Sequence, residues 1–160
     1  MTAVSYEARL TELGIELPGP FPPHDPLDAV VVHGGTARTS GSLPRTADGV
    51  LADEGILGRD VTTADGAGCA DLAARNALSL LRAHLGSLDA IERLLTMTVF
   101  VACTPEFVEQ PAVADGASRV LQEIFGDAGR HTRSAIGVAA LPRGAPVEVE
   151  ITAALRSGAP

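Results

Sequence analysis

The chain has 160 residues, of which 46% are hydrophobic and 20% are charged, and its formal net charge at pH 7 is −8. This length predicts a single domain, residues 1–160, with a buried core. The acidic balance argues against nucleic-acid binding, which depends on basic surface. No run of about 18 apolar residues occurs and charges fall within the first ten positions, so we expect a cytoplasmic protein without membrane contact.

The cysteines and histidines show no metal-binding pattern. Cys69 and Cys103 lie far apart and belong to no CxxC motif, so we expect free, buried thiols rather than a disulfide. The four histidines form neither an HExxH motif nor a cluster with carboxylates. We therefore expect no metal and no cofactor.

The N-terminal part predicts a short helix and then a hairpin. The stretch YEARLTELGIELP favours a helix that ends at Gly14 and Pro18, and a Pro-rich connector completes residues 1–23. The stretch LDAVVVHGGTARTSGSLP predicts two strands joined by a turn at Gly34-Gly35. Residues 45–66 carry many Gly and Asp without sustained periodicity, so we expect them to be irregular.

The middle of the chain predicts two long helices separated by a strand. Leucines recur at helical spacing from Ala67 to Leu85, and Gly86 is a candidate C-cap. Residues 91–103 are rich in β-branched side chains and predict a strand. Residues 104–126 predict a second helix whose regular part starts after Pro111, because proline delays or kinks a helix.

The last segment, residues 129–155, predicts two strands separated by the loop LPRGAP. The core order is then ββαβαββ, which is typical of an α+β fold with two long helices covering one face of a single sheet. Apolar residues would lie on both faces of this predicted sheet. They are VFVA, Ile136, Val138, Val147, Val149 and Ile151. We expect the second face to be buried by self-association; helices on both faces are the alternative.

Two charged residues stand out in this last segment, since unpaired charges are costly in a packed interior. Arg133 opens an apolar strand, so it binds a ligand or, alternatively, satisfies a buried acid or strand-end carbonyls. Glu148 alternates with apolar neighbours, and an apolar wall would raise its pKa toward that of a general base; a solvated strand face is the alternative. If the two strands form an antiparallel hairpin, both side chains can reach one end of the sheet.

Three stretches, TRSAIGVAALPRGAPVEVE, TSGSLP at 39–44 and TMTVFVACTPEF, together resemble the RidA/YjgF family of reactive intermediate deaminases. The resemblance covers roughly residues 24–155, and LGIELP resembles the leader of a longer subgroup. It implies a chorismate-mutase-like fold and a homotrimer with ligand clefts between subunits.

The resemblance also implies a set of site residues. The arginine that binds the substrate carboxylate in the family corresponds to Arg133, and the glutamate that directs water onto the imine carbon corresponds to Glu148. Ser40 and Gly41 match the serine and glycine that face the cleft. Phe125 resembles an aromatic wall of the cleft, with a core contact at a helix end as its alternative.

Two departures weaken the match to the usual 2-iminoacid deaminases. Ala135 stands where classical members have a cysteine and offers a substrate only its backbone groups, and Leu27 lies nearest to their tyrosine. The resemblance implies hydrolysis of a small enamine or imine acid without a cofactor. A non-catalytic trimeric binder or sensor of small carboxylates is the alternative. Endoribonuclease activity is disfavoured by the acidic balance and by an aromatic content of 3%.

Overall fold

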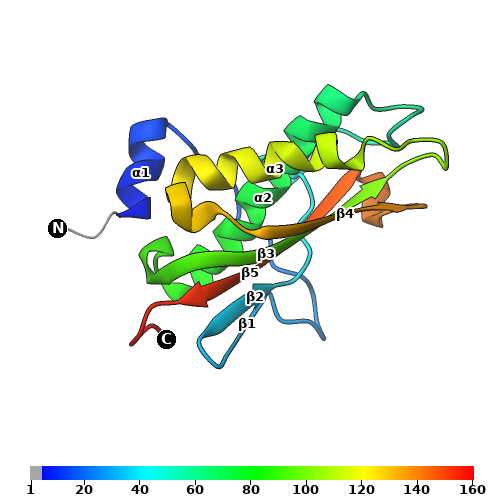
Figure 1. Ribbon diagram of the computed structural model, residues 1–160. Coiled ribbons are helices and arrows are strands. Elements are labelled where there is room, and N and C mark those ends of the chain that lie inside the picture. The colour runs from blue at the N-terminus through cyan, green and yellow to red at the C-terminus, as the bar shows by residue number, and fades with distance from the viewer. Residues whose placement is uncertain (1–4) are drawn as a thin grey trace.

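The structure of the protein, a computed structural model that describes residues 5–160, contains one five-stranded sheet. Its strands are β1 (Val30–His33), β2 (Thr36–Thr39), β3 (Ile91–Ala102), β4 (Thr132–Val138) and β5 (Val147–Leu155). Their order in the sheet is β1-β2-β5-β3-β4, so the last strand of the chain is central (Figure 1). All neighbours are antiparallel except β3 and β4, which are parallel.

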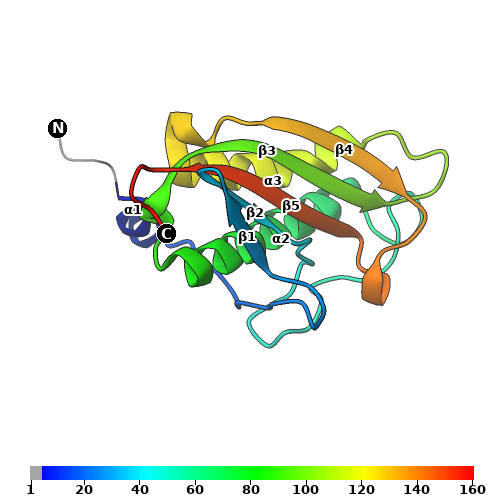
Figure 2. The ribbon, with the colours of Figure 1, turned by 90° about the horizontal axis from the view of Figure 1, so that it is seen from below.

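Two long helices, α2 (Thr63–Leu85) and α3 (Gln110–Phe125), lie side by side on one face of this sheet. The short helix α1 (Tyr6–Leu13) packs beside the end of α3. Seen from below, the strands lie in front of the helices (Figure 2). The α+β architecture and the ββαβαββ order predicted from the sequence are confirmed.

The helix ends follow local chemistry. The Thr62 side chain accepts a hydrogen bond from the Asp65 amide at 3.1 Å, so α2 begins earlier than predicted, and Gly86 ends it in the left-handed conformation that favours glycine. Pro111 lies in the first turn of α3, where its missing N–H is tolerated. The expected start after Pro111 was therefore slightly late.

The hairpin turn was predicted correctly. Gly34 and Gly35 have φ angles of 57° and 74°, the left-handed geometry that a tight two-residue hairpin requires. Residues 45–62 contain only isolated bridges and turns, so the expected irregular segment is confirmed up to the start of α2.

The core lies between the helices and the inner face of the sheet. Small residues of α2 allow close packing, since Ala70, Ala73 and Ala77 are fully buried. Val147 and Val149 are equally buried against the helices. Cys69 is buried and free, and burial raises the pKa of its thiol to about 11, with Asp53 and Asp65 adding to the shift.

Two expectations, one about Cys103 and one about the outer face of the sheet, were wrong. Cys103 is only half-buried, although it is free as predicted. The outer face is not uniformly apolar, because β5 presents Glu148, Glu150 and Thr152 there while its apolar residues face the helices. Exposed apolar side chains on this face, such as Val31 and Ile136, are therefore mixed with polar ones.

The last two strands do not form a hairpin, because β3 lies between them. On β3, Met97 pairs with Arg133 and Phe100 pairs with Glu148. Successive side chains of a strand point to opposite faces of the sheet, and Met97 and Phe100 are separated by an odd number of positions. Their side chains therefore point to opposite faces. Arg133 consequently lies on the helix side and Glu148 on the outer side.

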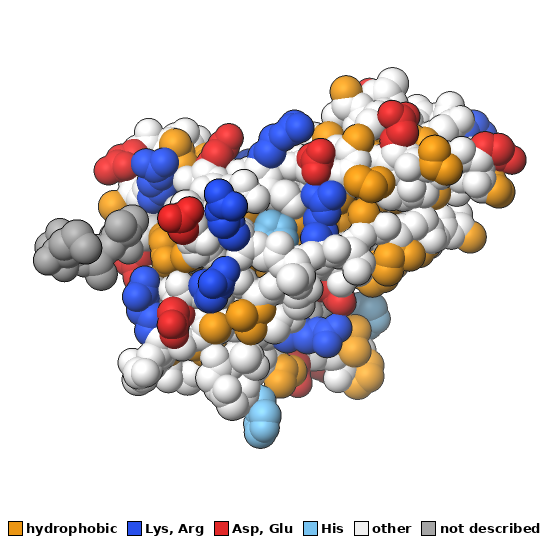
Figure 3. Space-filling model, viewed as in Figure 1, with side chains coloured by type: hydrophobic (Ala, Val, Ile, Leu, Met, Phe, Trp, Pro, Cys, Tyr) orange, Lys and Arg blue, Asp and Glu red, His pale blue; other side chains and the backbone are white. Residues whose placement is uncertain are grey.

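The surface is mixed in charge. Figure 3 shows basic and acidic side chains interspersed over α1 and α3, and hydrophobic side chains gathered toward the end of the molecule where β4 ends. Exposed Val108 and Ile136 belong to that end of the fold. None of the helices described within residues 5–160 is long and apolar enough to span a membrane.

Candidate functional site

Three of the predicted site residues, Ser40, Gly41 and Glu148, line one cavity of about 200 Å³. We call it the Glu148 cavity. Its walls come from the Pro-rich connector, the segment after β2, α2, the loop before β5 and β5 itself. The lining residues are Phe21, Pro22, Pro23, His24, Leu27, Ser40, Gly41, Ser42, Leu43, Arg45, Asn76, Pro142 and Glu148.

The chain after β2 is fixed against β5 by backbone hydrogen bonds. Ser42 donates to the Val149 carbonyl at 2.8 Å and accepts from the Val149 amide at 3.0 Å. Gly41 lies directly against Glu148, and a Cβ atom there would overlap the carboxylate. Glycine is thus required for this close approach. The Ser40 hydroxyl donates to the Asp28 carbonyl at 2.5 Å, so it secures the segment just before β1 to the cavity wall.

Glu148 is the acidic group of the cavity. Burial raises the pKa of its carboxyl group above the usual range, and the nearby charge of Glu150 raises it further. Glu150 itself pairs with Arg38 at 3.1 Å. Within residues 5–160 the Glu148 carboxylate accepts no hydrogen bond from another side chain or from the backbone. It is therefore free to accept one from a ligand or a water molecule.

Asn76 is a cavity residue that reasoning from the sequence missed. It is 2% exposed on α2, and its amide nitrogen donates to the carbonyls of Leu43 and Arg45, both at 2.9 Å. These two bonds fix the amide orientation, and its Oδ1 is buried without a partner among the described residues. One signal was present in the sequence: an asparagine within the Ala- and Leu-rich run AARNALSLL.

Arg45 is a second missed residue and brings positive charge to the cavity. Its guanidinium lies over the Phe21 ring, 5.5 Å from the centroid. Burial lowers the pKa of Arg45, and the nearby charge of Arg143 contributes to the same shift. Arg45, and not Arg143, is among the residues that line the Glu148 cavity.

Arg133 does not reach this cavity within one chain. Its guanidinium donates to Asp115 at 2.9 Å, to the Ser118 hydroxyl at 3.0 Å and to the Pro111 carbonyl at 3.3 Å. Arg133 therefore pairs with an acid and a carbonyl in the structure, although Asp115 is not buried and Pro111 lies in α3 and not at a strand end. Ser118 in turn lies 3.1 Å from Nε2 of His131, which extends the network.

Phe125 and Ala135 also lie outside the Glu148 cavity. Phe125 is 4% exposed and its ring centroid lies 4.5 Å from that of Tyr6, so the structure places it in the core and not on the wall of this cavity. Ala135 pairs with Val99 on the parallel side of the sheet and packs against the core. Leu27, nearest to the missing tyrosine, does line the cavity.

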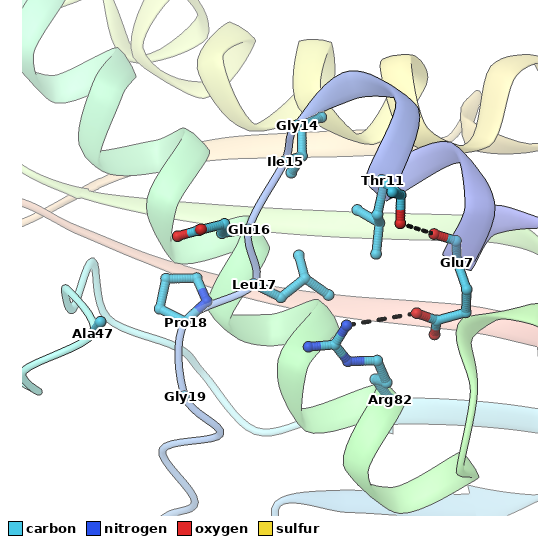
Figure 4. Close-up of a pocket in the computed structure, with 11 residues that line it drawn as sticks. Glu7, Thr11, Gly14, Ile15, Glu16, Leu17, Pro18, Gly19, Ala47 and Arg82 are labelled. Carbon is cyan, nitrogen blue, oxygen red and sulfur yellow. Dashed lines mark hydrogen bonds and ion pairs between the residues drawn. The ribbon is translucent and has the colours of Figure 1, made fainter.

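A larger groove, of about 590 Å³, lies between α1, the connector and α2 (Figure 4). Three charged residues line it, namely Glu7, Glu16 and Arg82, and Arg82 lies 3.5 Å from the Glu7 carboxylate. The Thr11 hydroxyl donates to the Glu7 carbonyl at 3.3 Å. Because Arg82, the cation of this lining, is already paired with Glu7, the groove offers less for binding an acid than the Glu148 cavity does.

Comparison with known proteins places the fold in a family. The family described as "YjgF/chorismate_mutase-like, putative endoribonuclease" matches residues 7–155. Protein TCP17 of Trypanosoma cruzi is 40% identical over 144 residues, which is 89% of each chain.

Two solved structures are similar over nearly the whole chain. Atu1372 of Agrobacterium tumefaciens, of unknown function, is 38% identical, with a TM-score of 0.85 over 94% of this chain and 92% of that one. A Shewanella oneidensis protein described as a putative endoribonuclease is 32% identical, with a TM-score of 0.90 over 95% of this chain and 100% of that one. The chain therefore belongs to the YjgF/RidA family with the chorismate-mutase-like fold.

Proposed function

We propose that the protein hydrolyses small reactive enamine or imine acids to the corresponding oxoacids, with Glu148 directing the attacking water. The observation that carries this proposal is the Glu148 carboxylate in its cavity. It is half-buried, its pKa is raised, and no described residue occupies its oxygens. A carboxylate of this kind is suited to general base catalysis.

The proposed reaction requires few catalytic groups from the protein. Water adds to the carbon of the C=N bond as Glu148 accepts one of its protons, which gives a tetrahedral carbinolamine. The C–N bond then breaks with protonation of the nitrogen, so that ammonia leaves and the C=O bond forms. Imines hydrolyse readily, and positioning of the water and the substrate contributes the rate enhancement without a cofactor.

The substrate carboxylate needs a cation. The family resemblance assigns this role to Arg133, but in one chain Arg133 is bonded to Asp115 on the opposite side of the sheet. In the homotrimer that we expect, a neighbouring chain would have to present its Arg133 to the Glu148 cavity.

The proposal is tested with Glu148→Gln. We expect ammonia release from a 2-iminoacid, generated in situ by an amino-acid oxidase, to fall at least about 100-fold, because a general base contributes at least that much. Calorimetric binding of pyruvate, a stable oxoacid analogue, should persist. The matched control is Glu150→Gln, which changes a carboxylate on the same strand face that pairs with Arg38 outside the cavity.

Equal turnover by wild type and Glu148→Gln would remove Glu148 from the reaction. A wild type that binds pyruvate but never accelerates imine hydrolysis would favour the alternative, a binder or sensor of small carboxylates. The Shewanella oneidensis protein is described as a putative endoribonuclease, but a net charge of −8 and 3% aromatic residues suit RNA poorly, so we expect no RNA cleavage.

A further inference from the structure

Arg133 lies on the edge strand β4 and is held by three acceptors that all belong to α3. Its Nη1 donates to the Asp115 carboxylate at 2.9 Å and to the Ser118 hydroxyl at 3.0 Å, and its Nη2 donates to the Pro111 carbonyl at 3.3 Å. Among the arginines that form ion pairs within residues 5–160, Arg133 has the least exposed side chain, at 21%. One helix therefore fixes this guanidinium and still leaves part of it accessible.

These contacts use only part of the guanidinium. Its five N–H donors are two on each Nη atom and one on Nε. Asp115 and Ser118 take both donors of Nη1, and Pro111 takes one donor of Nη2. The Nε–H and the second Nη2–H have no acceptor among residues 5–160. Two donors on neighbouring nitrogens of this planar group match the two oxygens of a carboxylate.

His131 fixes the direction of the Ser118 hydroxyl. Its Nδ1 lies 2.6 Å from the Gly129 carbonyl, which can only accept, so in the neutral ring Nδ1 carries the hydrogen and Nε2 is an acceptor. Nε2 lies 3.1 Å from the Ser118 hydroxyl, which therefore donates to it. The oxygen of this hydroxyl is then left to accept from Arg133.

Asp115 holds the guanidinium at one end only. Its Oδ1 accepts from Nη1 of Arg133, while its Oδ2 lies 3.9 Å from Arg119. An acid that competed with a substrate for Arg133 would occupy the two donors that remain free. Asp115 does not, so its contact leaves room for a second carboxylate on the same guanidinium.

We infer that Asp115 and Ser118 are positioning residues, which hold Arg133 so that its Nε–H and one Nη2–H are ready for a substrate carboxylate. The inference rests on the proposed function, in which Arg133 supplies the cation, and adds the two side chains that orient this cation. A guanidinium that is already fixed loses less conformational entropy when the substrate binds, so the benefit lies in affinity. Because all these contacts lie within one chain, they persist when a neighbouring chain completes the cavity.

The test is calorimetric binding of pyruvate by the full chain, with a pair of variants at each position. Asp115→Ala and Ser118→Ala remove an acceptor, whereas Asp115→Asn and Ser118→Thr keep one. We expect each alanine variant to weaken pyruvate binding about fivefold, the usual effect of one hydrogen bond, and each conservative variant to stay within about twofold of wild type. The matched control is Arg119→Ala, which removes the other cation near Asp115 and should leave binding unchanged.

Steady-state kinetics gives a second measurement that a purely structural role would not change. With a 2-iminoacid generated in situ, Asp115→Ala should raise KM and leave kcat nearly unchanged, because the carboxylate contact contributes equally to the bound substrate and to the transition state. A variant that is partly unfolded loses kcat at an unchanged KM. Thermal unfolding checks that every variant is folded.

Three results would overturn the inference. Tighter pyruvate binding by Asp115→Ala would mean that Asp115 competes with the substrate carboxylate. Alanine variants that unfold at lower temperature but bind pyruvate like wild type would mean that the contacts only join β4 to α3. Folded wild type that does not bind pyruvate would remove the carboxylate role of Arg133 itself.

These outcomes are separate from those for the proposed function. Turnover that depends on Glu148 but is unaffected in KM by Asp115→Ala and Ser118→Ala would overturn the inference and leave the proposed hydrolysis intact. Pyruvate binding that depends on Asp115 and Ser118 in a protein without turnover would do the reverse.

Discussion

Glu148 is placed where its ionisation opposes folding. Its pKa is raised in the folded chain by burial and then by Glu150, so the folded state holds this proton to higher pH than the unfolded state does. The unfolding free energy should therefore fall as pH rises from the ordinary glutamate range through the raised pKa. Arg38, paired with Glu150, and Arg45, in the cavity lining, are the neighbouring cations.

Glu148→Gln removes this titration, so the variant should be more stable than wild type at about pH 8 and equal to it at about pH 4. Urea denaturation at the two pH values measures the difference, with Glu150→Gln for comparison. A variant that is less stable than wild type at pH 8 would mean that the charged carboxylate is favoured in the fold.

Single residues were predictable where a motif specified them. Ser40, Gly41 and Glu148 were found from short sequence patterns, and the structure brings them to one cavity. Asn76 and Arg45 were missed because neither belongs to such a pattern. Their relevance arises only when α2 packs behind the segment after β2, which no local spacing reveals.

At the scale of elements, Asn76 joins α2 to the segment that carries the cavity wall. Asn76→Ala would leave the carbonyls of Leu43 and Arg45 without their donor in a buried place. We expect a loss of about 1–3 kcal/mol of unfolding free energy in urea denaturation. The control is Ser79→Ala, which alters an equally buried polar residue of α2 whose side chain forms no hydrogen bond to this segment within residues 5–160. Equal stability of the two variants would contradict the joining role.

Elements with regular periodicity were predictable, and their pairing was not. Leucine spacing and a C-cap glycine indicated α2, and β-branched residues indicated β3. The strands β4 and β5 are consecutive in the sequence, and a hairpin between them was considered. The helix α3 instead returns the chain so that β4 lies parallel to β3. Such pairing depends on tertiary packing, which a local pattern does not contain.

The whole molecule presents an open sheet face of mixed character, with exposed Val31 and Ile136 beside polar strand residues. We expect a homotrimer, as the family resemblance implies, in which this face is covered by neighbouring chains. Light scattering at micromolar concentration should give three times the mass of the chain. Ile136→Asp should shift the mass toward that of a monomer, because it buries a charge in the interface. A monodisperse wild-type monomer would contradict the expectation.

The central place of β5 affects how this fold can be made on the ribosome. The hairpin of β1 and β2 reaches β3 and β4 only through β5, which is synthesised after all of them. During translation, the edges of β2 and β3 that pair with β5, and the side of α2 that packs on β5, would stay uncovered until the C-terminal residues emerge. A nascent chain stalled before residue 147 should thus be sensitive to protease, and the Glu148 cavity would be the last part of the molecule to form.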